Sequence, residues 1–414
     1  MDGTGASAPA TLETDRYRRK RAAIIAAAAD IINHRGVKGM TLADVAASVG
    51  LITTSVTYYF KKKEDLAEAC FQDAIERFEA LIDRALAEQA TPPARLRAFL
   101  GLCLDQDRRI RQGLEPPLAG LSDIRALTEP QRTRALDAYG DLFRKVRSLF
   151  LTPDLGWMNR RRATARTYLL MEQIFWLRAW IYRYDFDDYP RVLDRMCDIL
   201  VGGLMAKGET WAPRVLDGWG PGVIDCNARS RDAFFLAATR LINRFGYRGV
   251  SVERISAELN VTKGSFYHHN EAKDDLVVSC FERSFAMVRK AQTAALSGLG
   301  SAWDKLSAVA RTLVEHQLSE AGPLLRTSAL SALPEAIRLR MVEQSYRLSD
   351  RFAALISDGI AEGVIRPVDP MIAAQMLGAT LNAAADLRDH AAGVTQAAIA
   401  DLYAKPLLTG VFTE

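Results

Sequence analysis

The 414-residue sequence has few cysteines and no long apolar run. Its five cysteines are odd in number, widely scattered and without a C-x-x-C pair, which argues against a disulfide framework and against a zinc site. The longest nearly apolar run, residues 22–32, contains Asp30 and is shorter than the roughly 18 residues of a membrane span. The N-terminus also lacks the basic start and apolar stretch of a signal peptide. The sequence therefore predicts a globular protein of the reducing cytoplasm, with no membrane association.

A large excess of charge of one sign is also missing. The sequence has 54 basic and 50 acidic residues, a net charge of +4, so any surface for nucleic acid must be local. Hydrophobic residues make up 49% and charged residues 25%, as in folded globular proteins. Residues 1–14, which are mostly small or polar, are predicted to form a disordered leader.

A repeat organises the rest of the chain. Shifted by 210 residues, segment 24–71 aligns with segment 234–281 without a gap, and 13 of the 48 positions are identical. The identities include Asn33 with Asn243 and Lys63 with Lys273. A period of this length indicates that a protein-sized unit occurs twice, because solenoid repeats are only 20–50 residues long.

Each copy begins with a pattern typical of short helices. Apolar residues at helical spacing form one stripe in 24–32 and another in 234–242. We expect these helices to stop at Gly36 and Gly246 in a left-handed C-terminal cap.

A second helix, a tight turn and a third helix follow. Thr41 and Ser251 are good N-caps for the second helix. Gly50 and Asn260 both tolerate positive φ, so a tight turn is expected there. A short helix through Ser55 then completes a helix-turn-helix, whose last helix can enter the major groove of DNA.

These segments, TLADVAASVGLITTSVTYYFKKKEDL and SVERISAELNVTKGSFYHHNEAKDDL, resemble the DNA-binding head of the TetR/AcrR family of transcriptional regulators. The resemblance implies an all-α fold with two tandem units. Each unit would have a three-helix head and a larger helical domain that binds a small molecule and dimerises. No cofactor is expected. The predicted divisions are a leader (1–14), a first head (15–71), a first helical domain (72–214), a linker (215–227), a second head (228–281) and a second helical domain (282–414).

The resemblance also implies which residues contact DNA. The expected residues of the first head are Arg18, Arg19, Arg21, Thr41, Thr53, Thr54, Ser55, Thr57, Tyr58, Tyr59 and Lys63. Those of the second head are Ser251, Thr262, Lys263, Gly264, Ser265, Tyr267, His268, His269 and Lys273.

The two heads differ in charge and in their third helices. The first head, residues 15–66, has ten basic and five acidic residues, whereas the second, residues 225–276, has eight and seven. Ile52 cannot cap the third helix of the first head, so Thr53 is expected to do so. Thr57 replaces the tyrosine that is usual in the family, and Asn270 stands where Phe60 fills the first core. Either both heads bind DNA, or the second is a structural relic.

The helical domains are less informative. An aromatic stretch that includes Phe175, Trp176 and Trp180 is a candidate ligand pocket, with Arg178 available for an anion; the alternative is ordinary core. The polar residues His316, Asp386, Asp389 and His390 are expected to be surface or satisfied residues.

The last helices of the two units, about residues 163–206 and 368–410, are predicted to pack together, so that one chain imitates a dimer. The alternative is a homodimer that displays four heads.

The leading functional hypothesis is a repressor that binds a double-stranded DNA operator and responds to a small apolar or amphipathic effector. A DNA-binding scaffold with one vestigial head, controlled by a protein partner, is the alternative. An enzyme is disfavoured because the sequence lacks H-E-x-x-H, G-x-S-x-G and P-loop motifs.

Overall fold

The computed structural model of the chain describes residues 15–216, 219, 226–247, 250–258, 273–298, 300–383 and 394–414. Regular structure in these residues is helical, apart from one isolated β-bridge between Met205 and Ile365. The predicted all-α fold is confirmed. No helix in this described part of the chain combines the length and apolarity needed to span a bilayer.

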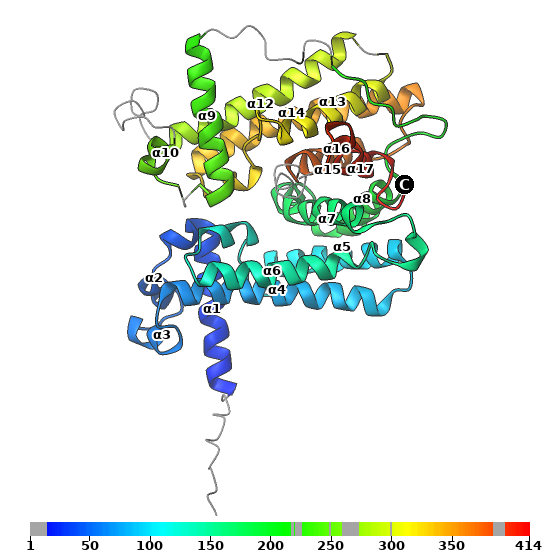
Figure 1. Cartoon of the computed structure of the whole chain (residues 1–414). Coiled ribbons are helices and arrows are strands. Elements are labelled where there is room, and N and C mark those ends of the chain that lie inside the picture. The colour runs from blue at the N-terminus through cyan, green and yellow to red at the C-terminus, as the bar shows by residue number, and fades with distance from the viewer. Residues whose placement is uncertain are drawn as a thin grey trace, which may run out of the picture.

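The first unit consists of a small head and a body of longer helices (Figure 1). The head contains α1 (Asp15–Gly39), α2 (Leu42–Ser48) and α3 (Thr53–Tyr59). The body contains α4 (Lys63–Glu88), α5 (Pro92–Arg111), η1 (Leu121–Ala126), α6 (Gln131–Arg147), η2 (Pro153–Leu155), α7 (Arg160–Trp180), η3 (Ile181–Arg183), η4 (Phe186–Asp188) and α8 (Tyr189–Gly202).

The second unit repeats this plan. Its head contains α9 (Cys226–Phe245) and α10 (Val252–Glu258), while residues 259–272 lie outside the described residues. Its body contains α12 (Lys273–Gly298), α13 (Ala302–Leu318), η5 (Thr327–Ala332), α14 (Glu335–Glu362), α15 (Pro370–Ala383), α16 (Gln396–Tyr403) and α17 (Lys405–Thr409). Helices α2 and α10, α4 and α12, and α7 and α15 each begin 210 residues apart, so the register of the sequence repeat extends into the bodies.

The two bodies stack as four layers of helices (Figure 1). One outer layer contains α4, α5 and α6, and the other contains α12, α13 and α14. Between them, α7 and α8 pack against α15, α16 and α17. The two stretches that the sequence predicted to meet therefore lie at the centre of the molecule.

One apolar core runs through both bodies. A single contiguous cluster of buried side chains extends from Ile24 in α1 to Val411 near the end of the chain. A separate cluster joins α9 to the first half of α12 and the beginning of α14. The predicted boundaries at 72–214 and 282–414 thus divide the sequence, but the two bodies share their core. Four cysteines, Cys70, Cys103, Cys197 and Cys280, are buried free thiols.

The segment after α8 crosses to the second unit. The indole of Trp303 donates a hydrogen bond to the carbonyl of Thr210 at 2.8 Å, and the indole of Trp211 donates to Asp401 Oδ1 at 2.7 Å. Arg311 donates to the carbonyl of Pro213 at 2.9 Å. These contacts attach the end of the first unit to α13 and α16 before the predicted linker begins.

Helix α1 does not end where the sequence predicted. Gly36 has a positive φ of 67°, as expected, but its ψ of 170° is far from the left-handed helical value near +47°. Helical structure resumes beyond it and continues to Gly39. Gly36 therefore kinks α1 instead of capping it.

Candidate nucleic-acid interface

The helix-turn-helix of the first head is built by local interactions. Thr41 caps α2, because its hydroxyl accepts a hydrogen bond from the backbone N–H of Asp44 at 3.1 Å. Gly50 has a φ of 65°, and the turn was predicted at this position because glycine tolerates positive φ. Val45 and Val56 are buried and join α2 and α3 to the core of the head. The predicted cap and turn are both confirmed.

The start of α3 differs from the prediction. Ile52 occupies the N-cap position, and no side chain caps the helix. Thr53 is the first helical residue, so the expectation that Thr53 caps the helix is wrong. The backbone conformation at Ile52 is extended, which suits an N-cap, and its carbonyl accepts the first bond of the helix, from the N–H of Ser55 at 2.9 Å. Backbone geometry here overrides the preference for a capping side chain.

The outward face of α3 is open to solvent. The side chains of Ile52 and Tyr58 are 71% and 67% exposed. Thr53 and Thr54 are also exposed, and Ser55, Thr57 and Tyr59 are half-buried. The hydroxyl of Thr57 donates to the carbonyl of Thr54 at 2.9 Å, so its proton is used inside the helix.

Basic side chains flank the helix-turn-helix along the chain, at the starts of α1 and α4. Arg18 and Arg19 are exposed, and Arg18 pairs with Asp15 at 2.5 Å. Arg21 lies with its guanidinium 5.3 Å from the centre of the Phe60 ring, and Phe60 fills the core as predicted. Lys63 donates to the carbonyl of Lys38 at 3.2 Å. Side chains of this kind suit phosphate contacts that position a protein on DNA.

A tyrosine cluster holds α3 against α1. The ring of Tyr17 lies 4.8 Å from that of Tyr59 and 6.2 Å from that of Tyr58, measured between centroids. The rings of Tyr58 and Tyr59 are 5.2 Å apart and nearly perpendicular. Sequence reasoning missed Tyr17, because the only signal was a tyrosine within a basic stretch.

The second head is described in part. The hydroxyl of Ser251 accepts from the N–H of Arg254 at 3.2 Å at the start of α10, as predicted for an N-cap. The ammonium group of Lys273 lies 4.2 Å from the centre of the Tyr247 ring. The predicted contacts Thr262, Lys263, Gly264, Ser265, Tyr267, His268 and His269, together with Asn270, lie outside the described residues.

Each head is attached to its body by the same asparagine. Asn33 in α1 donates to the carbonyl of Leu118 at 2.8 Å and accepts from the N–H of Gly120 at 2.9 Å. Asn243 in α9 donates to the carbonyl of Leu324 at 2.9 Å and accepts from the N–H of Arg326 at 3.0 Å. These paired bonds fix each head to the segment before η1 or η5. The repeat identity of Asn33 and Asn243 was the signal, but its role was not deduced from sequence.

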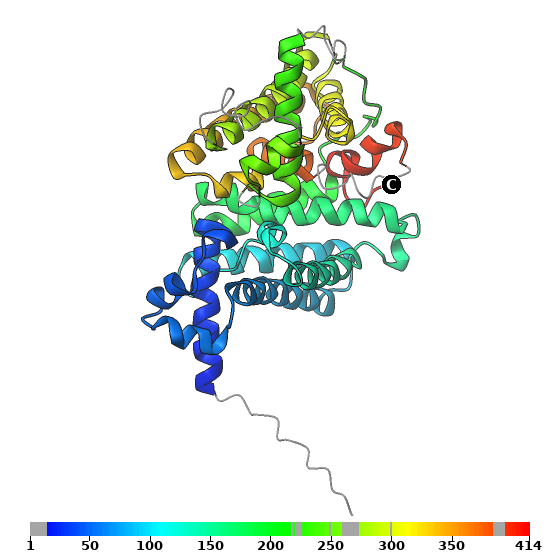
Figure 2. The same cartoon turned by 60° about the vertical axis from the view of Figure 1, so that its left-hand side comes forward.

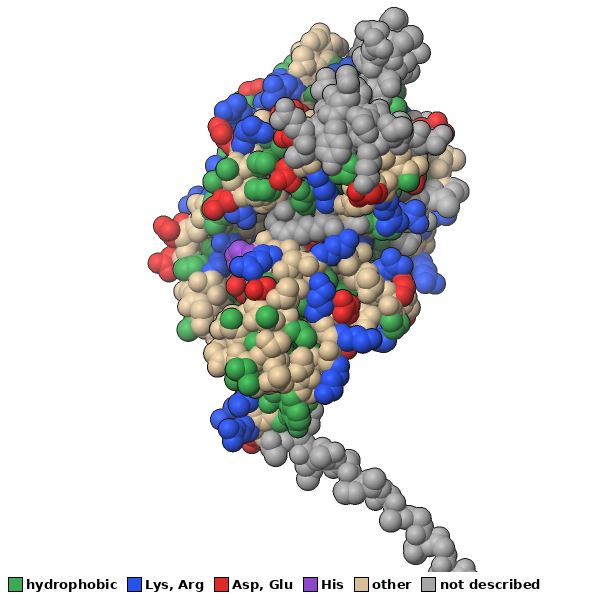
Figure 3. Space-filling view, turned by 90° about the vertical axis from the view of Figure 1, so that its left-hand side faces the viewer, with side chains coloured by type: hydrophobic (Ala, Val, Ile, Leu, Met, Phe, Trp, Pro, Cys, Tyr) green, Lys and Arg blue, Asp and Glu red, His purple; other side chains and the backbone are tan. Residues whose placement is uncertain are grey.

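Both heads lie toward the same side of the molecule, as two views show (Figures 1 and 2). Figure 3 views that side and shows Lys and Arg side chains in several groups over it, including one where α1 begins. Arg125 of η1 also reaches the second head, since it donates to the carbonyl of Asn243 at 3.0 Å.

Two equivalent positions of the units meet at the central interface. Glu172 in α7 accepts a hydrogen bond from Asn382 in α15, and these two residues are 210 positions apart. Equivalent positions of the two units therefore touch, as they do at the axis of a symmetric dimer. Gln173 adds bonds to the carbonyl of Met376 at 3.0 Å and to Thr380 Oγ1 at 3.1 Å.

Charged groups surround the Glu172–Asn382 pair. Burial raises the pKa of Glu172, while the nearby Arg326 opposes that shift. Burial and the neighbouring Arg125 lower the pKa of Arg326 to about 9, and Glu172 acts against them. Asn382 also accepts from the N–H of Thr327 at 3.0 Å. Arg125 and the backbone N–H of Arg326 both bond to Asn243, so this cluster connects the Glu172–Asn382 contact to the attachment of the second head.

The aromatic stretch of α7 lies at interfaces between helices. Trp180 is buried, and Phe175 contacts Phe78 of α4 with ring centroids 6.2 Å apart. Trp176 donates to Gln375 Oε1 of α15 at 3.3 Å. Arg178 was expected to be available for a ligand anion, but its guanidinium already lies 3.7 Å from Asp107 Oδ1. The contacts of this stretch therefore support ordinary helix packing instead of the candidate ligand pocket.

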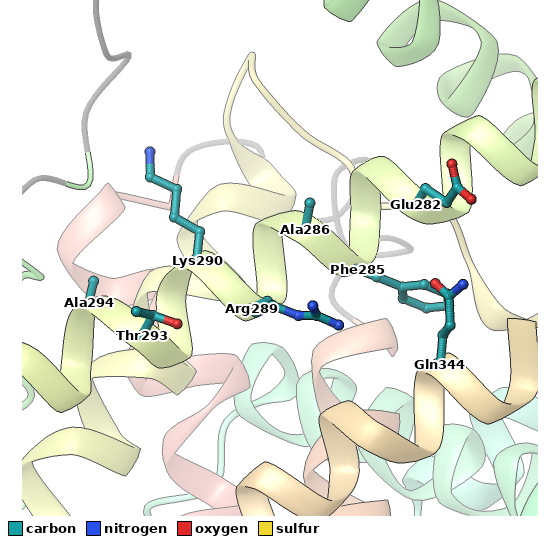
Figure 4. Close-up of a pocket in the computed structure, with 8 residues that line it drawn as sticks. All are labelled: Glu282, Phe285, Ala286, Arg289, Lys290, Thr293, Ala294 and Gln344. Atoms are coloured by element: carbon teal, nitrogen blue, oxygen red, sulfur yellow. The ribbon is translucent and has the colours of Figure 1, made fainter.

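An open groove lies on the second body between α12 and α14 (Figure 4). It has a volume of about 590 Å³ and is lined by Glu282, Phe285, Ala286, Arg289, Lys290, Thr293, Ala294 and Gln344. Lys290 also lies over the ring of Trp219 at 5.4 Å.

His316, in α13, was expected to be surface or satisfied. It is instead buried against Trp219, and its Nε2 has no hydrogen-bond partner among the described residues. Burial lowers the pKa of His316 to about 4. Asp386, Asp389 and His390 lie outside the part of the chain that the structure describes.

Some of the proteins similar to this chain are named as transcriptional regulators. Over 132 residues, 32% of this chain and 66% of the relative, the sequence is 24% identical to the Transposon Tn10 TetC protein of Escherichia coli. Over 87 residues, 21% of this chain and 44% of the relative, it is 36% identical to the HTH-type transcriptional regulator BetI of Paraburkholderia phymatum. The chain thus spans only part of the length of these relatives. The solved TetR family transcriptional regulator PfmR from Thermus thermophilus is 20% identical, with 43% of this chain and 97% of that chain covered and a TM-score of 0.38.

Family matches occur in both units. The match to "Bacterial regulatory proteins, tetR family" occurs twice, at residues 24–70 and 235–280. Residues 299–411 match "Tetracyclin repressor-like, C-terminal domain". The two head matches coincide with the two copies of the repeat, and the C-terminal match covers most of the second body. The chain belongs to the TetR family of bacterial regulatory proteins, with two tandem TetR-type units.

Proposed function

We propose that this chain is a cytoplasmic transcriptional regulator, not an enzyme, that binds duplex DNA through its helix-turn-helix heads and acts as a repressor. The observation that carries the proposal is the exposed face of α3, together with the basic side chains at the starts of α1 and α4 that flank it along the chain. In this proposal α3 enters the major groove, while Arg18 and Arg19 at the start of α1 and Lys63 at the start of α4 contact phosphates of the backbone. The repressor role follows the family expectation.

The test is binding of the full chain to a random pool of duplex DNA at low ionic strength, followed by measurement on a selected duplex. R18A/R19A should weaken binding and reduce the slope of log affinity against log salt by about 1.8, which is about 0.9 for each lost phosphate contact. R191A/R195A is the matched control, because these exposed arginines lie on α8 in the body. A wild-type chain that binds no duplex would overturn the proposal.

We also propose that one chain binds as an internal dimer, so that its operator has two different halves. The central packing of α7 and α8 against α15, α16 and α17 supports this arrangement, because those surfaces are already occupied within one chain. Selection from the random pool should yield an asymmetric two-part site, and light scattering should give a mass of about 46 kDa. K263A/Y267A should alter sequence preference; if it changes neither affinity nor preference, the second head is a relic.

The groove between α12 and α14 is our proposed site for a small effector. Arg289 and Lys290 lie there beside the apolar Phe285, Ala286 and Ala294, a combination that suits an amphipathic anion. Decanoate should raise the thermal midpoint of the wild-type chain but not that of R289E, and it should weaken DNA binding. If decanoate shifts the thermal midpoints of both proteins equally, the groove is not the effector site. If it shifts neither midpoint, control by a protein partner is the alternative.

A further inference from the structure

The outward face of the first recognition helix lacks the side chains that usually identify guanine and adenine. Residues 52–59 read Ile-Thr-Thr-Ser-Val-Thr-Tyr-Tyr and contain no Arg, Lys, Asn or Gln. Those four residues provide the bidentate hydrogen bonds that distinguish these bases in the major groove. The helix must therefore discriminate base pairs by another chemistry.

Its exposed groups are suited to thymine. Among the base edges of the major groove, that of thymine carries an apolar group, the C5-methyl, and apolar or threonine side chains contact it. Ile52 is 71% exposed, and Thr53 and Thr54 beside it are exposed as well. Packing of an isoleucine side chain against thymine methyl groups removes apolar surface from water, which is favourable.

The surroundings hold these groups in place. The Tyr17–Tyr58–Tyr59 cluster ties the other end of α3 to α1, and the buried Val56 seats the middle of the helix in the core. Ile52 also follows directly after the Gly50 turn, so its backbone is fixed by the helix-turn-helix itself. These contacts hold the N-terminal end of α3, with the side chains of Ile52, Thr53 and Thr54, in a fixed position relative to α1.

We propose that the first head selects thymine-containing steps, and that Ile52, Thr53 and Thr54 read the thymine methyl groups. This inference rests on the proposed DNA-binding function. The residue of the second head that corresponds to Thr53 is Lys263, whose side chain has a different chemistry. Recognition of thymine methyl groups is therefore assigned to the half of the operator that the first head contacts.

Uracil substitution tests this inference directly, because uracil differs from thymine only by the missing methyl group. A duplex selected by the full chain is resynthesised with each thymine replaced singly by uracil, and the dissociation constants are measured. Replacing a contacted thymine with uracil should weaken binding about fourfold, which corresponds to the ~0.8 kcal/mol of a buried methylene. The sensitive positions should cluster in one half of the site.

Variants then assign the effect to residues. I52A should weaken binding to the thymine duplex and abolish the penalty at one uracil position, and T53S and T54S, which remove one methyl each, should act similarly at their own positions. L296A is the matched control, since Leu296 is 52% exposed on α12. It should leave uracil sensitivity unchanged, and thermal midpoints should stay near that of the wild type.

The outcomes separate this inference from the proposed function. If the wild-type chain binds uracil and thymine duplexes equally well, methyl reading is wrong while DNA binding stands. If the uracil penalty persists in I52A, T53S and T54S, another element reads the methyls and the assignment is overturned. If no duplex binds at all, the proposed function itself fails.

Discussion

Replacing Asn382 with aspartate places a second carboxyl group against Glu172 at the axis between the two units. In the wild-type chain, the Asn382 amide donates a hydrogen bond to Glu172. The variant loses that donor, but it keeps the oxygen that accepts from the N–H of Thr327. The change therefore isolates the contact between the two units.

The expected cost follows from Coulomb's law. Two carboxylates about 4 Å apart repel by about 4 kcal/mol at an effective dielectric constant near 20. Arg125 and Arg326, which influence the pKa of Glu172, offset part of this repulsion. We expect N382D to lower the free energy of unfolding by about 2–4 kcal/mol at pH 8.

The cost should diminish in acid. Burial already raises the pKa of Glu172, and a second carboxylate raises it further, so the folded variant binds a proton more tightly than the unfolded chain does. Lowering the pH then favours folding, because a protonated carboxyl group restores the missing donor. The difference from the wild type is largest at pH 8 and shrinks as the pH falls through the raised pKa.

Urea denaturation at pH 8 and pH 5.5 measures these effects. E172Q should recover most of the stability that N382D loses, because the double variant has one carboxylate at the axis. N159D is the matched control: Asn159 caps α7 by accepting from the N–H of Arg162, and aspartate caps equally well. The reasoning is refuted if N382D is as stable as the wild type at pH 8, or if E172Q fails to rescue it.

Two further predictions concern single buried positions. G203A should cost about 3 kcal/mol or more, because Gly203 has a φ of 69° and an added Cβ would lie 2.5 Å from the backbone carbon of Thr409. Its control, G208A, has a positive φ of 101° but open space, and should cost about 1 kcal/mol in urea denaturation; equal losses would contradict the crowding argument. Because the pKa of His316 is lowered to about 4, the unfolded chain binds its proton more tightly, and stability should fall by roughly 3 kcal/mol between pH 7 and pH 4. H316Q should flatten this dependence of the unfolding free energy on pH, and a parallel pH curve would refute the assignment.

The features of the first head that were predictable from the sequence depend on residues that are close to one another along the chain. Thr41 caps α2 through a backbone N–H only three residues away, and Gly50 adopts positive φ within a single turn, so each could be recognised alone. The start of α3 was less predictable, since the backbone placed Ile52 at the cap although its side chain cannot serve there. At Gly36 the sequence indicated positive φ correctly, but not that the helix would resume.

The packing of the last helices of the two units was predictable from the repeat, but the individual residues that make contacts across the chain were not. The identity of Asn33 and Asn243 marked an important position, but its partners come from loops more than 80 residues away. Likewise, the aromatic composition around Trp176 suited a pocket and an interface equally well. Only the packing of α7 against α15 distinguishes these possibilities.

The covalent connection between the units has a consequence for how their interface responds to dilution and to mutation. Association of α7 and α8 with α15, α16 and α17 is unimolecular, so lowering the protein concentration does not separate them, whereas a two-chain assembly falls apart below its dissociation constant. A substitution in a two-chain assembly also appears on both sides of the axis at once. In this chain a substitution changes only one of the two equivalent positions. An acid, Glu172, can therefore face an amide, Asn382, at equivalent positions, a pair that identical subunits are unable to form.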